Sequence, residues 1–282
     1  MEYEDFCKTY ALDKMKVIGF NQGQFGDLCI NTVACRAFKD AAPNSILHFG
    51  INKKYESLRP ILEHQKNIDK IHIWDAYNDW PSEEDAKHII SEKFDFVFEA
   101  MPRHTSEAWY LKNHQAAEVC LMHKLKPPQN LQVELTKYFD TDRNNKHVAI
   151  NLFAETRGSS KMPSTKRSIE ICEIIKSKGL IPVQIGLPEQ EQICEKRFLG
   201  SFFECVKFVL SCDLLITVDS AMSWIASGYS FPTLGLYSYS YYYGAKTSKN
   251  WQPINPNGLF LESEQVNKIE DEAILNGISR LL

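Results

Sequence analysis

The stretch between Cys212 and Tyr237, CDLLITVDSAMSWIASGYSFPTLGLY, constrains the fold of this chain more than any other. It holds two short apolar runs, Leu214–Val218 and Thr233–Tyr237, separated by a polar turn and a short segment that suits a helix. Two strands joined by a helix are typical of a parallel sheet, because the connection between parallel strands must cross over the sheet. The stretch therefore predicts an α/β fold.

Asp219 and Ser220 follow directly after the first apolar run of this stretch. In open parallel sheets, ligands bind beyond the carboxyl ends of the strands. Backbone N–H groups at the start of the following helix can also bind an anion at such a position. Asp219 could instead serve only to cap that helix, which is a common role for aspartate. The spacing leaves both interpretations open.

Length and composition limit the class of protein. The chain has 282 residues, of which 44% are hydrophobic and 24% are charged, so we expect one large or two medium globular domains. The net charge of −4 gives no reason to expect a nucleic-acid partner. No apolar run approaches the ~18 residues of a membrane span, so at most peripheral membrane contact is expected. The N-terminus is acidic, whereas a signal peptide begins with basic residues and an apolar core. The eight cysteines are scattered, so we expect them to be reduced and buried as small apolar side chains in a cytoplasmic protein.

The first half of the chain alternates between patterns typical of strands and of helices. This alternation predicts a doubly wound parallel sheet. The expected strands are 16–20, 46–49, 68–73 and 94–99, and the expected helices are 27–40, 53–62 and 81–91. Regularity weakens over 101–125, whose second part suits a helix, and 125–146 is expected to connect two domains.

The second half repeats this style. Strands are expected at 147–152 and 180–185, helices at 165–178, 189–198 and 202–211, and an amphipathic helix at the end of the tail, 262–282. Gly179 is expected to terminate its helix at the C′ position. We therefore predict two Rossmann-like doubly wound domains facing a cleft, an N-terminal domain at 1–139 and a C-terminal domain at 140–282. The last helix belongs to the C-terminal part of the chain, and packing of this helix against the N-terminal domain is an open alternative.

Three loops that follow expected strands carry candidate site residues. In the first, Gly23 and Gly26 let the backbone turn tightly before Asp27, which could also serve as a helix cap. The second, 155–161, combines hydroxyls with cations before a helix, as phosphate binding requires, although these residues alone favour a solvated loop with ordinary surface cations. The third contains Glu189, which could accept hydrogen bonds from a ribose or simply cap a helix.

These pieces together resemble glycosyltransferase family 9, the heptosyltransferases, which have the two-domain GT-B fold. The resemblance covers about residues 16–240. VIGFNQGQFGDLCINTVACRAFKDAAPNSILHFG is similar to the family's first strand, G-x-x-G-D turn and helix. CDLLITVDSAMSWIASGYSFPTLGLYS is similar to its D-[ST]-G-x-x-H turn and closing strand.

The resemblance implies roles for the matching positions. Asp27 matches the general base on the acceptor hydroxyl. The implied donor diphosphate ligands are Thr156, Ser160, Lys161, Ser220 and Ala221. The implied contacts to the donor sugar and nucleoside are Glu189, Asp219, Met222 and Trp224. Gly26, Arg103 and His104 fall on the acceptor side, where a structural role is an open alternative for His104.

The implied activity is an inverting, metal-independent transfer of a heptose or hexose-like sugar from a nucleotide-diphosphate sugar to a glycan, lipid-linked glycan or other hydroxyl acceptor. ADP is the family's usual nucleotide, lipopolysaccharide or glycan synthesis is the implied setting, and no cofactor or metal is expected. Two positions depart from the family pattern, because Ala221 replaces its glycine and Trp224 its histidine. These departures keep two alternatives open, a non-catalytic nucleotide- or carbohydrate-binding protein on the same fold and a GT-B nucleotide-sugar epimerase.

Overall fold

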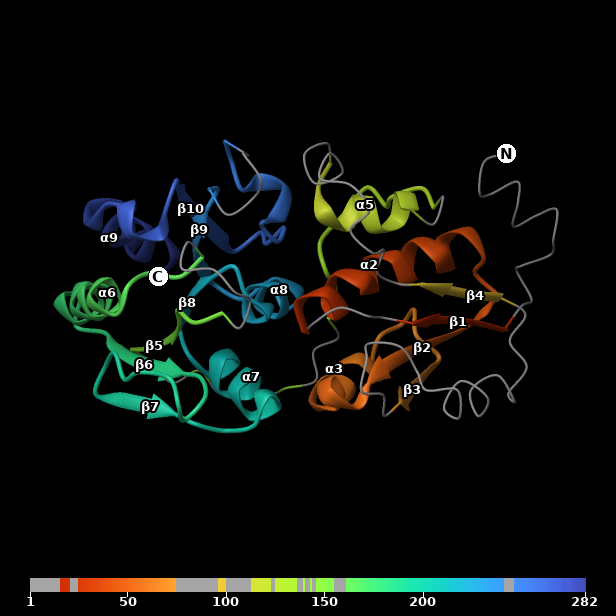
Figure 1. The fold of residues 1–282 in the computed structure, drawn as a ribbon, viewed down its shortest axis with the longest axis horizontal. Helices are drawn as coiled ribbons and strands as arrows, with labels where there is room; N and C mark the ends of the chain where they lie inside the picture. The colour runs from red at the N-terminus through yellow and green to blue at the C-terminus, as the bar shows by residue number, and fades with distance from the viewer. Residues whose placement is uncertain are drawn as a thin grey trace. The chain divides into compact units, whose positions relative to one another are not determined.

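The computed structural model describes residues 16–20, 25–74, 96–99, 113–122, 125–135, 139, 143, 146–154, 161–240 and 246–282. The chain divides into two compact units, Met1–Tyr138 and Phe139–Leu282. Each unit is built on one sheet in which all strand pairs are parallel (Figure 1). The predicted α/β class with parallel sheets is therefore confirmed.

The described sheet of the first unit has the strand order β3-β2-β1-β4. Its strands are β1 (Lys16–Phe20), β2 (Ile46–Asn52), β3 (Lys70–Trp74) and β4 (Phe96–Glu99). Helices α2 (Phe25–Ala41) and α5 (Gln115–Met122) pack together on one face, and α3 (Arg59–Leu62) lies on the other (Figure 1). The chain order reverses between β1 and β4, and α2 begins shortly after β1 ends.

The helix expected at 53–62 is divided in two. Its first part is the 3₁₀ helix η2 (Lys53–Leu58), and only its last four residues form the α-helix α3. Asn52 caps η2, since its Oδ1 accepts a hydrogen bond of 2.9 Å from the backbone N–H of Lys54. Pro60 has no N–H to donate to the preceding turn, so it can lie only at the start of an α-helix.

The sheet of the second unit has the strand order β10-β9-β8-β5-β6-β7. The strands are β5 (His147–Asn151), β6 (Ile181–Ile185), β7 (Lys196–Phe198), β8 (Leu214–Val218), β9 (Thr233–Ser238) and β10 (Gly258–Ser263). Numbered within the unit, this order is 3-2-1-4-5-6, the order of dinucleotide-binding sheets. The chain order reverses between β5 and β8.

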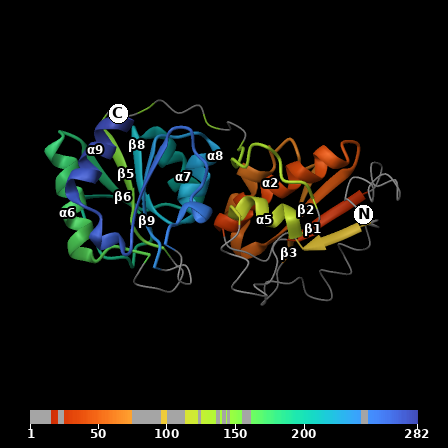
Figure 2. The same cartoon turned by 90° about the horizontal axis from the view of Figure 1, so that it is seen from above.

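Helices cover both faces of this sheet. They are α6 (Thr165–Ser177), α7 (Phe202–Ser211), α8 (Ala221–Gly228) and α9 (Asp271–Leu281), with 3₁₀ turns η4 (Lys249–Trp251) and η5 (Val266–Lys268). Figure 2 shows α6 and α9 on one side of the strands and α7 and α8 on the other. The buried face of α9, which includes Ile274 and Ile278, lies in the core of this second unit.

The helix predicted for 189–198 is absent, and this prediction is wrong. Residues 191–195 are irregular and Lys196–Phe198 form the edge strand β7. The reason is Gln184, a fully buried side chain of β6. Its Nε2 donates to the carbonyl of Glu191 at 2.9 Å, and its Oε1 accepts from the N–H of Ile193 at 3.0 Å. These bonds satisfy the backbone of the segment without a helix.

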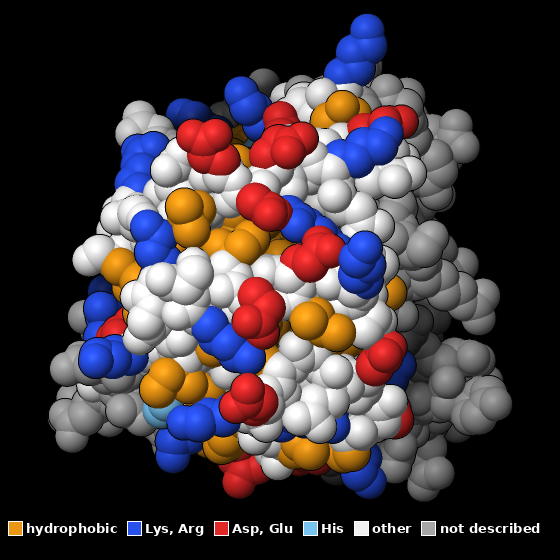
Figure 3. All heavy atoms as spheres, turned by 90° about the vertical axis from the view of Figure 1, so that its left-hand side faces the viewer, with side chains coloured by type: hydrophobic (Ala, Val, Ile, Leu, Met, Phe, Trp, Pro, Cys, Tyr) orange, Lys and Arg blue, Asp and Glu red, His pale blue; other side chains and the backbone are white. Residues whose placement is uncertain are grey.

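One face of the second unit carries both signs of charge. On the face shown in Figure 3, acidic and basic side chains are interspersed and separated by small apolar areas. Surface ion pairs on α6, such as Lys176 with Glu173 at 2.9 Å, belong to this pattern. Among the described helices, none is long and apolar enough to cross a membrane.

Candidate functional site

The carboxyl ends of β5 and β8 form the position where a ligand is expected in the second unit. These two strands are neighbours in the sheet, and the chain order reverses between them. In open parallel sheets, the helices that follow two such strands lie on opposite faces, which leaves a crevice at the strand ends. Asn151 ends β5, while Asp219 and Ser220 follow β8 directly.

Lys161 and Asp219 form an ion pair at this edge. The Nζ of Lys161 lies 2.6 Å from Oδ2 of Asp219, and the side chains are 11% and 16% exposed. The pair joins the loop before α6 to the turn before α8, two segments that are 58 residues apart. The N-cap of α8 is Ser220, so Asp219 lies outside the helix. The interpretation that Asp219 only caps this helix is therefore wrong.

Ser220 is held by two side chains of the neighbouring strands. Its Oγ donates to Oδ1 of Asn151 at 2.9 Å and lies 3.0 Å from Oγ1 of Thr217. Thr217 Oγ1 lies 3.2 Å from the same Asn151 oxygen. Since the Ser220 hydroxyl is used in this way, it makes no capping bond to α8.

The carbonyl of Ser220 is also fixed. It accepts hydrogen bonds from the hydroxyl of Ser223 at 2.7 Å and from the N–H of Ser223 at 3.2 Å. Ser223 Oγ in turn lies 3.0 Å from the hydroxyl of Tyr237, a completely buried side chain of β9. Burial, and then the negative charge of Asp219, raise the pKa of Tyr237 well above 10, against the effect of the Ser223 bond. Tyr237 therefore stays a neutral phenol that supports the turn.

The described residues on either side of the loop with the other predicted phosphate ligands are held by hydrogen bonds. The N–H of Ala154 donates to the sulfur of Met162 at 3.2 Å. The N–H of Ser164 donates to Oδ1 of Asn267 at 2.8 Å. Thr156 and Ser160 lie outside the described residues, so their predicted role stays a prediction.

Glu189 lies in a tight turn after β6. Arg197 holds this turn, because its Nη2 donates to the carbonyls of Leu187 at 3.1 Å and Gln190 at 3.0 Å. The side chain of Glu189 is exposed. With no helix after it, the capping interpretation of Glu189 is wrong, while its predicted contact with a ribose stays a prediction.

Met222 and Trp224 lie in the first turn of α8, and their side chains are 4% and 3% exposed. Ala221, by contrast, is half-buried. In this structure Met222 and Trp224 belong to the packed side of α8, and their contact with a donor stays a prediction. The backbone of Ala221 and Met222 nevertheless begins the helix directly beside Asp219 and Ser220.

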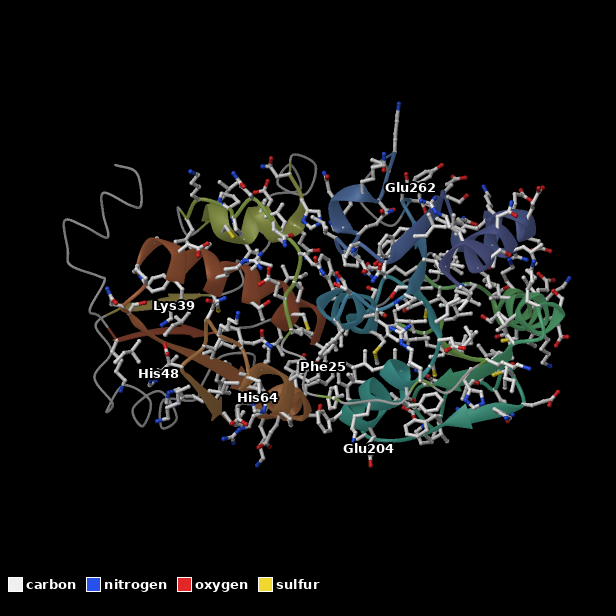
Figure 4. All side chains as sticks on the ribbon, turned by 180° about the vertical axis from the view of Figure 1, so that it is seen from behind. Phe25, Lys39, His48, His64, Glu204 and Glu262 are labelled. Carbon is white, nitrogen blue, oxygen red and sulfur yellow. The ribbon has the colours of Figure 1, made fainter. Side chains whose placement is uncertain are left out.

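Asp27 lies in the first turn of α2, in the first unit. It is the third residue of the helix and half-buried, and Gly26 precedes it within the same turn. Phe25, the first residue of α2 and labelled in Figure 4, packs edge-on against Tyr55, with ring centroids 5.0 Å apart. Arg103 and His104 lie outside the described residues. That Asp27 and Lys161 act in one cleft stays a prediction.

Sequence reasoning missed Asn151, Thr217 and Tyr237 as parts of this site. Asn151 and Thr217 are paired in the β5–β8 register, and Tyr237 lies on the next strand. A polar residue at the last position of an apolar strand, as Asn151 is in HVAIN, was the available signal. The contacts of Thr217 and Tyr237 depend on strand order, which the sequence does not state.

Comparison with known proteins identifies the fold. A family 9 glycosyl transferase from Veillonella parvula superimposes with a TM-score of 0.72 at 18% identity, over 95% of this chain and 97% of that one. The Escherichia coli heptosyltransferase WaaC, solved with ADP, gives 0.70 at 12% identity, over 95% and 100%. The chain has the fold of the family 9 glycosyltransferases. It is the GT-B fold that the sequence predicted.

Other comparisons set the limits of this likeness. No protein-family model and no curated protein sequence matches the chain. An iron-containing dodecameric heptosyltransferase, TibC, solved with ADP-D-β-D-heptose, gives a TM-score of 0.65 at 15% identity, over 95% of this chain and 76% of that one. Among the described residues of the present chain, no three His, Cys, Asp or Glu side chains gather as a metal site requires. Metal independence stays a prediction.

Proposed function

We propose that this protein is a glycosyltransferase that moves a heptose or hexose-like sugar from a nucleotide-diphosphate sugar to a hydroxyl of a glycan or lipid-linked glycan. The observation that carries the proposal is the Lys161–Asp219 pair beside the start of α8, at the point where the strand order reverses. Structures with the same fold include a heptosyltransferase with ADP and another with an ADP-heptose. ADP is accordingly the first nucleotide to test, and the cytoplasm is the proposed location.

Lys161 supplies the positive charge for the donor diphosphate. A lysine ammonium presents three N–H donors, and its pairing with Asp219 holds it at the edge of the sheet. The N-terminal end of α8 adds a partial positive charge in the same region. Both groups stabilise the leaving diphosphate as its negative charge develops, which lowers the barrier to cleavage of the donor bond.

Asp27 is the proposed general base. The acceptor oxygen attacks the anomeric carbon from the face opposite the diphosphate, the new C–O bond forms as the bond to phosphate breaks, and the hydroxyl proton passes to Asp27. A carboxylate in the first turn of a helix is stabilised in its charged form and is a weak base. It can still accept the proton late, when the attacking oxygen has become acidic.

One observation favours a second candidate function. Ala221 and Trp224 occupy the positions of the family's glycine and histidine, and the side chain of Trp224 is buried on the packed side of α8. A protein that binds the nucleotide sugar without transferring it would have the same fold. An epimerase that breaks the same bond without an acceptor is the third possibility to be separated by experiment.

Sugar transfer should be measured by NMR on wild type, Asp27→Asn and Asp40→Asn, with ADP-heptose and other nucleotide sugars and with glycan acceptors. Asp40 is an exposed aspartate at the other end of the same helix and serves as the control. We expect an inverted glycoside from wild type and from Asp40→Asn, and a loss of about 10²–10⁴ in kcat for Asp27→Asn.

Each contrary outcome is distinct. Near-wild-type transfer by Asp27→Asn would remove Asp27 as the base. Binding of nucleotide sugars by wild type without any turnover would favour the non-catalytic protein. Conversion of the donor alone into an epimeric nucleotide sugar would favour the epimerase.

A further inference from the structure

Asn151 determines what the Ser220 hydroxyl does. The second unit has three helices with a described serine N-cap, α6, α7 and α8. Ser164 and Ser201 cap their helices, since their hydroxyls accept from the N–H of Arg167 at 3.2 Å and of Glu204 at 3.3 Å. The Ser220 hydroxyl instead donates to Asn151 Oδ1 at 2.9 Å.

The backbone of Ser220 does not explain this difference. Its φ of −149° and ψ of 167° are extended, as an N-cap requires, and the helix starts at the next residue. Rotation about χ1 alone would bring its hydroxyl toward the N–H group of Met222, whereas the N–H of Ser223 already donates to the Ser220 carbonyl. The contact with Asn151, supported by Thr217 at 3.0 Å, is therefore what keeps the hydroxyl away from the Met222 N–H.

The strand register places Asn151 for this task. It ends β5 directly beside Thr217, its partner in the β5–β8 register. Its Oδ1 faces the hydroxyls of Thr217 and Ser220, and its side chain is half-buried. The Ser220 carbonyl is fixed separately by Ser223, so loss of Asn151 removes the main acceptor of the hydroxyl, leaves its 3.0 Å contact with Thr217, and does not release the turn.

We propose that Asn151 is a positioning residue that withholds the Ser220 hydroxyl from the N-terminus of α8, so that the first N–H groups of the helix are kept for the diphosphate of the donor. The identity of the ligand, a donor diphosphate, rests on the proposed function. The effect of Asn151 on the Ser220 hydroxyl does not depend on it. Without Asn151, Ser220 rotates, caps α8 and competes with the phosphate oxygens for the same N–H groups.

The conformational part is tested without any ligand, by amide hydrogen exchange of residues 219–224 in full-length protein. Asn151→Ala should slow the exchange of the Met222 N–H by about threefold or more, because a new cap bond stabilises the helix start by about that factor or a larger one. Asn151→Ala/Ser220→Ala should return to the wild-type rates, since no hydroxyl is left to form the cap. Asn151→Asp keeps an acceptor for Ser220 and should exchange like wild type.

The functional part is tested by calorimetric titration with ADP. We expect Asn151→Ala to weaken binding about tenfold, which corresponds to the loss of one good phosphate contact, and Asn151→Ala/Ser220→Ala to recover most of that loss. Asn257→Ala is the matched control, because Asn257 bonds the carbonyl of Ser230 on the exposed surface of the same unit. The affinity of Asn257→Ala for ADP should equal that of wild type.

The two parts fail in different ways. Unchanged exchange in Asn151→Ala would overturn the positioning role, whatever the protein binds. Slower exchange in Asn151→Ala together with no ADP affinity in any variant, wild type included, would support the positioning role and count against the proposed donor. A double variant that binds ADP no better than Asn151→Ala would overturn the competition between Ser220 and phosphate.

Discussion

Glu262 fixes a loop of the second unit by charge (Figure 4). Its carboxylate accepts hydrogen bonds from the hydroxyl and N–H of Ser248, at 2.7 and 2.6 Å, and from the hydroxyl of Thr247 at 2.9 Å. Burial raises the pKa of Glu262, but the bonds from Ser248 and Thr247 outweigh it and hold the pKa below the ordinary 4.5. The ionised form is thus the one that holds the loop.

This lowered pKa predicts a pH dependence of stability. A carboxyl whose pKa is lower in the folded state stabilises the fold above its unfolded pKa, and that contribution is lost as the pH falls through the folded value. At pH 7 we expect the free energy of unfolding of wild type to exceed that of Glu262→Gln by about 1 kcal/mol. This figure allows for solvent screening of the partly buried carboxylate. Urea unfolding of both proteins between pH 7 and 3 measures the difference.

The difference should be constant down to the ordinary pKa of 4.5 and then shrink. Glu189→Gln, which removes an exposed carboxylate from another loop, should change stability little at any pH. A difference in free energy of unfolding between wild type and Glu262→Gln that is the same at pH 7 and pH 3 would contradict the role given to ionised Glu262.

At the scale of single residues, the sequence predicted which residue types belong to the site better than it predicted which side chains contact one another. Lys161 and Asp219 were singled out, and the structure pairs them. Asn151 was not, because its role follows from its position beside Thr217 across two strands that are distant in the chain. A local pattern reports the residue type that a site needs, whereas the partner of each side chain depends on strand order.

At the scale of elements, helix ends follow their sequence signals closely. Gly179 was predicted at the C′ position of α6, and the structure places it there with a φ of +72°. Its N–H donates to the carbonyl of Lys176 at 2.9 Å, which closes the last turn. The left-handed conformation is the reason that glycine is needed, since no atom lies near enough to exclude a Cβ.

Gly179→Ala should therefore lose about 1 kcal/mol from the left-handed backbone strain alone. Gly179→Asn should lose less, because asparagine tolerates this conformation better than alanine does. Urea unfolding should give the highest free energy of unfolding for wild type, a lower value for Gly179→Asn and the lowest value for Gly179→Ala. An alanine variant as stable as wild type would show that the strain is relieved elsewhere.

The strands that the sequence missed are β7 and β10. β7 has only three residues, two of them basic, so no alternation marks it. β10, GLFLES, follows the turn residues Pro256 and Asn257 and places Leu259 and Leu261 at alternate positions, a signal that was present but overlooked. Edge strands are the hardest to predict, because one side has no partner to impose a pattern.

At the scale of the whole molecule, the cysteines test how the two cores are packed. The seven cysteines within the described residues are all buried and unpaired. We expect at most one of the eight thiols of the chain to react at once with a thiol reagent in the native protein, and all eight in urea. Spectrophotometric counting with an aromatic disulfide reagent checks this. Two or more fast thiols in the native protein would contradict the packing.

The overall architecture was predictable because alternating strands and helices permit few topologies. The strand order of the second sheet, with its reversal between β5 and β8, is what brings Lys161 and Asp219 to one edge. The donor, its base and the acceptor are not fixed by topology, since many functions occur on the same fold. Those depend on side chains at the site and require binding measurements.

The most direct measurement is calorimetric titration of the full-length protein with ADP, comparing wild type, Lys161→Met and Lys166→Met. Lys166 lies on α6 with its side chain 89% exposed, so its variant controls for the loss of one positive charge. We predict ADP binding by wild type and Lys166→Met, and affinity at least about tenfold weaker, or 1.4 kcal/mol, for a normally folded Lys161→Met. Equal affinity of Lys161→Met and wild type, or no binding of any nucleoside diphosphate by wild type, would contradict the proposal that this edge of the sheet holds the donor diphosphate.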